Sequence, residues 1–289
     1  MSAACAAGVN TNFANLSYAK VAVLGLVQGI SELLPISSTA HMRIVPALLG
    51  WADPGSAFSA AMQMAALLAV IAFFRDDIIG IAVGSYRSVR LRQFDDPQAQ
   101  LLLFMIIATV PIAIAGWSAS GLLNECNSPF RALSVVAWAC IGLGLLLGLA
   151  EIFARHVRQV ESATLRDAIL IGLAQVGALV PGVSRSGSTI TASLALGLRR
   201  EDAARLSFLI GIPAIALAGL HELWVLHHAH LSHHGWGVLG VGLATASASS
   251  FAGLWLLMNI LHRWSAWPFV VYRVALGALL LFLISRGWS

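Results

Sequence analysis

Apolar residues in this chain form long stretches, and six of them approach the roughly 20 residues that a helix needs to cross the hydrocarbon layer of a membrane. The six stretches cover residues 57–74, 99–123, 132–150, 206–226, 236–261 and 267–285. Charged residues lie mostly in the segments between them. The pattern therefore predicts an all-α integral membrane protein with six transmembrane helices.

Two further apolar regions, residues 18–50 and 168–198, are each interrupted in the middle by a proline and small hydroxyl residues. The first interruption reads LPISST at 34–39, and the second reads VPGVSRSG at 180–187. Proline ends a helix, and neither half of either region is long enough to span a membrane. Each region is therefore predicted to form a re-entrant hairpin of two half-helices that leaves the membrane on the side from which it entered.

The arginines between the stretches predict an orientation. Several arginines follow the first and the third predicted spans, and Arg263 follows the fifth, so the positive-inside rule places these segments in the cytoplasm. Residues 124–129 and 227–235 contain neither Lys nor Arg, which places them outside. Six crossings then put both termini outside. The first hairpin would enter from the outer side and the second from the cytoplasm.

The two halves of the chain resemble each other. The run GLVQ at 25–28 precedes the first break, and GLAQ at 172–175 precedes the second. Since each half has three crossings, a duplicated unit would sit upside down relative to its twin. The sequence therefore predicts a single polytopic domain, residues 1–289, built as an inverted-topology repeat of approximately residues 18–150 and 166–286.

The composition supports this class of protein and excludes others. Hydrophobic residues make up 58% of the chain and charged residues 10%, against about 25% charged in soluble proteins. The net charge of +4 is modest, and the basic residues form no arm suited to nucleic acid. We therefore expect a lipid bilayer around the chain and no nucleic acid as a partner.

Ionisable side chains inside a membrane are costly, so each one is a functional candidate by default. Five occur within the predicted hydrophobic zone, namely Glu32, His41, Arg43, Arg185 and Arg273. Three of these, Glu32, His41 and Arg185, lie in or beside the two breaks. Arg273 lies within the last predicted span, where it would pair with a carboxylate or line a cavity.

The first break is flanked by polar residues at helical spacing. Gln28 and Glu32 are four residues apart and share one helix face. Three residues of the types that cap helix N-termini follow the proline, namely Ser37, Ser38 and Thr39. His41 follows Ser38 by three residues, so both side chains can face one point. The start of the second half-helix would also bring free backbone N–H groups to the break.

The second break repeats this arrangement. Residues 186–189, Ser-Gly-Ser-Thr, are predicted to open a half-helix, with Arg185 just ahead of it, and Gly182 and Gly187 permit close approach of the backbone to a ligand. Two helix N-termini, hydroxyl groups and a guanidinium together predict a site for phosphate or diphosphate. A carboxylate such as Glu32 fits an anion site only if it holds a bridging divalent cation or transfers a proton. The combination favours phosphoryl chemistry over passive binding.

The runs QGISELLPISSTAH at 28–41 and PGVSRSGST at 181–189 resemble the two signature motifs of the undecaprenyl-diphosphatase family, of the bacitracin-resistance type. The resemblance covers essentially the whole chain. It implies a bacterial plasma-membrane enzyme that hydrolyses undecaprenyl diphosphate to undecaprenyl phosphate and phosphate. Such an enzyme recycles the lipid carrier for peptidoglycan synthesis, and its substrate is the diphosphate that the antibiotic bacitracin sequesters.

The resemblance also implies roles for individual residues. The catalytic residues would be Glu32, Ser38, His41 and Arg185. The substrate would be bound by Gln28, Ser37, Thr39, Ser184, Ser186, Gly187 and Thr189. Glu32 would also hold a divalent cation, Mg²⁺ or Ca²⁺, together with the diphosphate. Position 28 is Gln where many members have Glu, so Glu32 is the only carboxylate of the motif. Ala40 stands where Gly is common.

Two reaction routes fit these residues. In the first, Ser38 attacks the terminal phosphorus with His41 as its base. In the second, His41 or Glu32 activates water, and Ser38 positions the diphosphate. In both routes, Arg185 and the half-helix N-termini stabilise charge on the phosphoryl oxygens.

A secondary transporter or flippase for a phosphorylated polyprenyl lipid is the alternative function, because inverted repeats with broken helices are a transporter architecture. A transporter needs an anion site, but it does not need a carboxylate, a serine and a histidine beside that site. An intramembrane serine protease built on Ser38 and His41 leaves Arg185 unexplained.

Three further features complete the sequence-based picture. The six histidines between His221 and His234 do not form an HExxH motif, and we interpret them as part of an outer loop rather than a metal site. Gly144 and Gly148 form a GxxxG pair, which is typical of close packing inside a bundle and leaves a homodimer open. The first hairpin opens outward in the predicted topology, so we expect the active site to face the periplasmic or outer side of the bacterial inner membrane.

Overall fold

The computed structural model describes residues 10–287, apart from residue 94 and residues 125–128, and these residues form helices and no strands. In chain order the helices are α1 (Tyr18–Leu33), α2 (Ser38–Leu48), α3 (Ser56–Phe73), α4 (Arg75–Leu91), α5 (Pro97–Asn124), α6 (Leu133–Phe153), α7 (Leu165–Val176), α8 (Arg185–Ala195), α9 (Arg200–His228), α10 (His233–Arg263) and α11 (Trp267–Ser285). Short 3₁₀ helices are η2 (Asn12–Asn15), η3 (Pro129–Arg131), η4 (Val160–Ser162) and η5 (Gly177–Leu179). Most of the predicted outer loop at 124–129 and the side chain of Arg263 lie outside the described residues.

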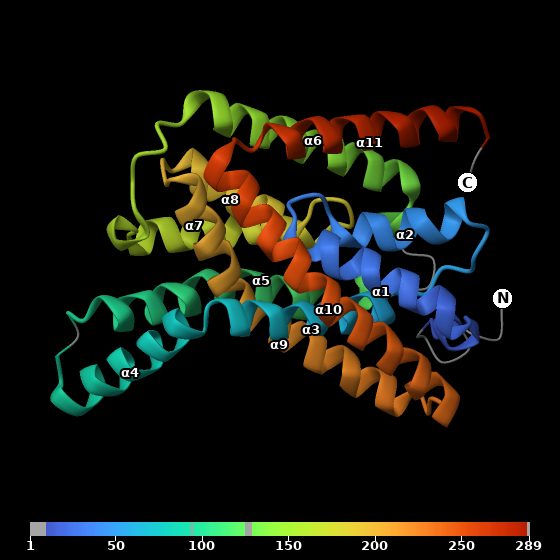
Figure 1. Ribbon diagram of the computed structural model, residues 1–289, viewed down its shortest axis with the longest axis horizontal. Coiled ribbons are helices and arrows are strands. Elements are labelled where there is room, and N and C mark those ends of the chain that lie inside the picture. The colour runs from blue at the N-terminus through green and yellow to red at the C-terminus, as the bar shows by residue number, and fades with distance from the viewer. Residues whose placement is uncertain (1–9, 94, 125–128, 288–289) are drawn as a thin grey trace.

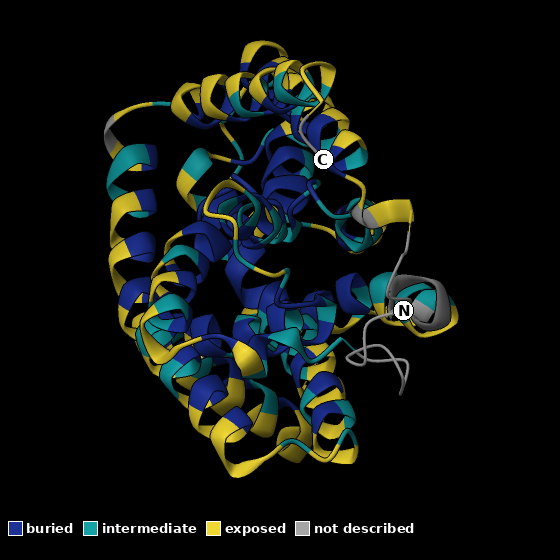
Figure 2. Cartoon of the chain, turned by 90° about the vertical axis from the view of Figure 1, so that its right-hand side faces the viewer, coloured by how far each residue is buried: buried dark blue, intermediate teal, exposed yellow. Residues whose placement is uncertain are grey.

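Six helices, α3, α5, α6, α9, α10 and α11, are long and apolar enough to cross a membrane. This finding confirms the prediction of six transmembrane helices, and α11 has the predicted bounds. Large apolar side chains such as Trp117, Trp138 and Trp255 point outward, and exposed positions follow the outer sides of the helices (Figure 2). An apolar exterior of this kind is suited to lipid and not to water. The chain is a multi-pass membrane protein.

Both predicted breaks are present, and each separates two short helices. α1 ends at Leu33 and α2 begins at Ser38, while α7 and η5 end before a second break that leads into α8. All four helices are shorter than the roughly 20 residues of a crossing. The helix–break–helix form of both regions is therefore confirmed. Their re-entry on the side from which they came stays a prediction.

The first half of the chain is interlocked with the second (Figure 1). α1 lies along α10, α6 lies beside α11, α5 packs against α7, and α3 packs on both α9 and α10. The broken helices thus exchange partners, since α1 contacts a helix of the second half and α7 contacts a helix of the first. Such an exchange is what a duplicated unit would give. The inverted orientation of the two units stays a prediction.

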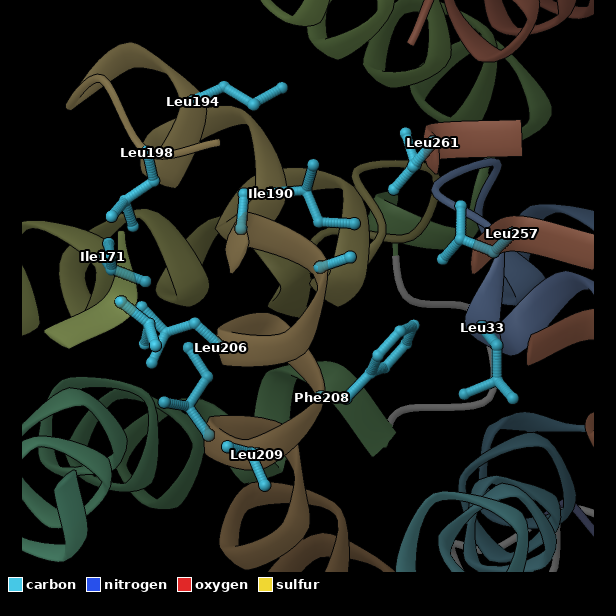
Figure 3. Close-up of a cluster of buried hydrophobic side chains, with 14 of the residues drawn as sticks. Leu33, Ile171, Ile190, Leu194, Leu198, Leu206, Phe208, Leu209, Leu257 and Leu261 are labelled. Atoms are coloured by element: carbon cyan, nitrogen blue, oxygen red, sulfur yellow. The ribbon is translucent and has the colours of Figure 1, made fainter. Parts of the chain in front are cut away.

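The largest buried apolar cluster joins the two halves beside the breaks (Figure 3). It includes Leu33 at the end of α1, Ile190 of α8, Phe208 of α9 and Leu257 of α10, each at most 1% exposed. Dense packing of these side chains leaves little freedom for the helices that carry them. The ends of α1 and α8 that face the breaks are therefore held by the core.

Two glycines on one face of α1 allow its close approach to α10. A Cβ atom added at Gly25 would overlap Thr245 of α10, and one added at Gly29 would overlap the hydroxyl of Ser249 and the carbonyl oxygen of Ala246. Small residues four apart let two membrane helices pack backbone to backbone. The α1–α10 contact therefore requires glycine at these two positions.

Replacing Gly29 with alanine is expected to destabilise the fold by about 1–3 kcal/mol, because the added methyl group would push α1 away from α10. The matched control is Gly240→Ala on α10, where no atom lies within 4 Å of the added Cβ. The measurement is the midpoint of thermal unfolding of each variant in detergent. Equal midpoints for the two variants would contradict this account of the interface.

The helix α4 was not predicted, because the arginines and aspartates of residues 75–92 were interpreted only as a cytoplasmic segment. Its buried positions, Ile81, Gly84 and Ser88, recur at intervals of three and four residues, which is the periodicity of an amphipathic helix. Gly84 packs against Gln98 at the start of α5. This periodicity is visible in the sequence, but the many charged residues of the same segment are the more prominent signal.

The GxxxG pair on α6 packs inside the chain. A Cβ atom added at Gly144 would lie 3.1 Å from Cβ of Arg273, and one added at Gly148 would lie 3.3 Å from Cγ1 of Val270. Both neighbours belong to α11. The pair therefore serves the α6–α11 contact, as the interpretation of close packing inside the bundle predicts.

Candidate active site

The second helix of each broken pair is capped by a serine with the same unusual backbone. Ser37 has φ 73° and its Oγ accepts a hydrogen bond from the Ala40 N–H, and Ser184 has φ 72° and its Oγ accepts one from the Gly187 N–H. A hydroxyl at the N-cap satisfies one of the free N–H groups of the first turn. The predicted start of the second half-helix at residue 186 is corrected, because Ser184 is the cap and α8 begins at Arg185.

The structure brings the two breaks into contact. The backbone N–H of Gly182 donates to Thr39 Oγ1 at 3.4 Å, and the hydroxyl of Ser186 donates to the carbonyl oxygens of Glu32 and Leu34 at 3.3 and 3.4 Å. The N-termini of α2 and α8 therefore lie near each other, as the predicted anion site requires. Each N-terminus contributes a partial positive charge.

Glu32 lies at the centre of the polar contacts. Its carboxylate is buried and accepts hydrogen bonds from Ser38 Oγ at 2.5 Å, from Gln28 Nε2 at 3.0 Å and from Arg185 Nη2 at 3.4 Å. Four of the predicted site residues thus form one network across both breaks. Because an isolated buried carboxylate is strongly disfavoured, the guanidinium and the two donors are what allow it to be charged.

Arg185 is fixed from α9 by two residues that sequence reasoning missed. Its Nη1 donates to the carbonyl oxygen of Ser207 at 3.2 Å, and a Cβ atom added at Gly211 would overlap the guanidinium. The hydroxyl of Ser207 is also 2.7 Å from Thr189 Oγ1. No local motif marks either residue, because their role depends on the packing of α9 against α8. Gly211 leaves the space into which the guanidinium fits.

Ser38 and His41 have different partners in the structure. Ser38 bonds to Glu32, whereas His41 Nδ1 lies 2.7 Å from the carbonyl oxygen of Ser37 and His41 Nε2 lies 2.6 Å from the hydroxyl of Tyr272. The expectation that Ser38 and His41 face one point, with His41 as the base for Ser38, is therefore not supported by the geometry. The group placed to take a proton from Ser38 is Glu32.

Arg273 is fully buried and bonds to the backbone of both breaks. Its guanidinium donates to the carbonyl oxygens of Pro35 at 3.1 Å, Gly182 at 2.7 Å and Val183 at 3.1 Å. Longer contacts of 3.4 Å reach carbonyl oxygens of α6. The expected carboxylate partner is absent among the described contacts of this residue. Arg273 instead holds the two breaks together through carbonyl groups.

The glycines of the second break face α6. A Cβ atom added at Gly182, whose φ is +101°, would lie 2.7 Å from the carbonyl oxygen of Val136, and one added at Gly187 would lie 3.0 Å from the Leu143 side chain. The missing side chain of each glycine therefore allows close packing against α6, and the expectation that these glycines admit a ligand to the backbone stays a prediction. Gly182 is required both by its left-handed φ and by the closeness of α6.

Within the described ranges, no group of three or more His, Cys, Asp or Glu side chains is placed to hold a metal ion. The interpretation of the histidines between His221 and His234 as part of an outer loop rather than a metal site stays a prediction. Around the breaks, Glu32 offers one carboxylate, and Gln28 lies beside it. Mg²⁺ is commonly held by one or two carboxylates together with substrate phosphates. These residues fit a cation shared with a diphosphate.

Comparison with known proteins places the chain in a family. The model of the family described as bacitracin resistance protein BacA matches residues 21–279. "Undecaprenyl-diphosphatase 2" of Mesorhizobium japonicum is 60% identical over 262 residues, which cover 91% of this chain and 99% of the relative. "Undecaprenyl-diphosphatase" of Gloeobacter violaceus is 48% identical over 92% of this chain and 91% of the relative, and that of Myxococcus xanthus is 45% identical over 94% and 91%. The chain belongs to the bacitracin resistance protein BacA family.

Proposed function

We propose that the protein hydrolyses undecaprenyl diphosphate to undecaprenyl phosphate and inorganic phosphate, which recycles the lipid carrier for peptidoglycan synthesis and confers bacitracin resistance. The observation that carries this proposal is the buried Glu32 carboxylate, bonded to both Ser38 and Arg185 where two helix N-termini meet. The names of the relatives agree with this activity. A transporter would need the anion site but not the serine–carboxylate pair.

The diphosphate would be bound between the two breaks. Arg185 and the N-termini of α2 and α8 supply positive charge there, and they would stabilise charge on the phosphoryl oxygens. Hydroxyl, amide and backbone groups that line the breaks would complete the binding, and these belong to Gln28, Ser37, Thr39, Ser184, Ser186, Gly187 and Thr189. The prenyl tail would extend into the surrounding lipid.

In the route that the geometry favours, Ser38 Oγ attacks the terminal phosphorus as its proton passes to Glu32, 2.5 Å away. The bond to the bridging oxygen breaks, and undecaprenyl phosphate leaves with the electron pair. Water then hydrolyses the phosphoserine. In the other route, water attacks the diphosphate directly, and Ser38 only positions it. A phosphoserine trapped in a single turnover would decide for the first route.

A divalent cation, Mg²⁺ or Ca²⁺, would be held by Glu32 together with the diphosphate oxygens. When bound, it would neutralise negative charge on the phosphoryl group. Ser38, Gln28 and Arg185, which bond to the Glu32 carboxylate, would hold it in place for this role. The Glu32 carboxylate with the Gln28 amide beside it supports a cation that binds together with the substrate.

The site is proposed to open to the periplasmic or outer side of the bacterial inner membrane. The clusters of arginine in residues 75–92 and 155–166, and their absence from residues 227–235, support this orientation. A homodimer also stays a proposal. Gly144 and Gly148 give it no support, because they pack against α11 of the same chain.

The function is tested with purified protein in sealed proteoliposomes and a prenyl diphosphate added from outside. We expect release of one phosphate per substrate with Mg²⁺ or Ca²⁺, and at least about a 100-fold slower release in excess chelator. A cysteine introduced in the first hairpin and labelled from outside gives the fraction of molecules whose hairpin faces outward. The rate of phosphate release should be proportional to that fraction. Lipid translocation without release of phosphate would favour the transporter instead.

A further inference from the structure

His41 is held at both ring nitrogens, and one of the two partners lies outside every motif considered so far. Nδ1 lies 2.7 Å from the carbonyl oxygen of Ser37, and Nε2 lies 2.6 Å from the hydroxyl oxygen of Tyr272 in α11. The two rings are nearly parallel, with centroids 5.7 Å apart and planes at 11°. Tyr272 is therefore the side chain through which α11 contacts His41.

The acceptor at Nδ1 decides which nitrogen of His41 can act as a base. A carbonyl oxygen only accepts hydrogen bonds, so Nδ1 carries a hydrogen. In the neutral imidazole, Nε2 then holds the lone pair, and the Tyr272 hydroxyl donates to it. His41 can take up a proton only at Nε2. The Tyr272 oxygen stands at that position.

Tyr272 is placed firmly and remains open on one side. The next residue, Arg273, ties this turn of α11 to the carbonyl oxygens of both breaks. Tyr272 itself is 42% exposed, and a phenol that donates to His41 can still accept a hydrogen bond from another group. The hydroxyl of Ser38 is engaged by Glu32. The site thus contains two separate proton-carrying pairs, Ser38–Glu32 and Tyr272–His41.

We infer that Tyr272 positions His41 and relays the proton that His41 takes up when water attacks phosphorus, an inference that rests on the proposed function. The water proton passes to the Tyr272 oxygen as the Tyr272 hydroxyl proton passes to Nε2 of His41. A P–O bond to water forms, and the bond to the leaving oxygen breaks with its electron pair. Tyr272 then donates its hydroxyl proton to the leaving oxygen and takes back the proton held at Nε2, so the phenol and the imidazole both end unchanged.

The test compares Tyr272→Phe with the unaltered chain in steady-state assays with a prenyl diphosphate and Mg²⁺. Phe keeps the stacked ring but removes the hydroxyl, so we expect kcat to fall by about 100-fold, with KM within about twofold. The same substitution in a His41→Gln background should add less than about a twofold loss, because the relay then has no acceptor. The matched control is Tyr18→Phe, which removes a tyrosine hydroxyl 3.2 Å from His234, outside the site. We expect it to retain full activity.

Each outcome has a distinct meaning. A Tyr272→Phe variant with unaltered kcat, or one that loses the same factor in both backgrounds, would overturn the relay while the proposed function stands. An altered KM with unaltered kcat would assign Tyr272 to substrate binding and also overturn the relay. Absence of phosphate release from the unaltered chain would overturn the proposed function itself, and the relay would fall with it.

Discussion

Replacing Glu32 with glutamine is expected to lower kcat for phosphate release by about 10³-fold or more. The amide has the same shape as the carboxylate, but it cannot take the proton of Ser38, and a lost general base costs about 10²–10⁴-fold. It also leaves the buried guanidinium of Arg185 without its anion. The measurement is single-turnover phosphate release by protein that elutes as a folded species in detergent.

The matched control for this substitution is Glu151→Gln. Glu151 is also buried and bonds to an arginine, Arg200, but it lies at the end of α6 and outside both breaks. Breaking a buried pair costs about 3–5 kcal/mol, so both variants should unfold at lower temperature. Only Glu32→Gln should show the lower rate of phosphate release. If it kept a tenth or more of the original kcat, Glu32 would not be the base that takes the proton of Ser38.

Replacing Arg273 with methionine is expected to lower stability by about 3 kcal/mol and kcat by about 100-fold. The substitution keeps much of the side-chain volume but leaves buried carbonyl oxygens of both breaks without a donor, and each such loss costs about 1–3 kcal/mol. A shift of about 1 Å between the breaks would account for the loss of rate. Thermal unfolding in detergent and single-turnover phosphate release measure the two effects.

Arg158→Met is the control for Arg273→Met. Arg158, in the segment between α6 and α7, also donates to backbone carbonyl oxygens, of Leu196 and Ser162, and it pairs with Asp167, so its contacts lie outside both breaks. This variant should lose stability and keep its kcat. An Arg273→Met protein with unaltered kcat at temperatures where it is folded would show that the breaks do not depend on Arg273 for their alignment.

The features that sequence predicted are those that local pattern determines. Hydropathy over about 20 residues located the six spans, and proline with hydroxyl residues located both breaks. Scarcity of charge pointed to Glu32, His41 and Arg185, because ionisable residues are rare in the apolar regions and these three lie in or beside the breaks. All of these signals can be found within a window of a few helical turns.

The features that sequence did not predict depend on contacts between distant parts of the chain. Ser207 and Gly211 matter only because α9 passes beside Arg185, and Tyr272 matters only because α11 passes beside His41. Spacing alone suggested that His41 serves Ser38, since the two residues are one helical turn apart. At the start of α2, the Ser38 side chain is instead directed toward Glu32 and donates a hydrogen bond to it.

The contacts of Arg273 have a consequence for how this region can change over evolutionary time. The guanidinium bonds to main-chain oxygens of Pro35, Gly182 and Val183, which every amino acid possesses. These bonds therefore do not depend on which side chains the two breaks carry. They do depend on the number of residues in each break, because one insertion or deletion would move the oxygens out of reach. Relatives should therefore agree in the length of both segments.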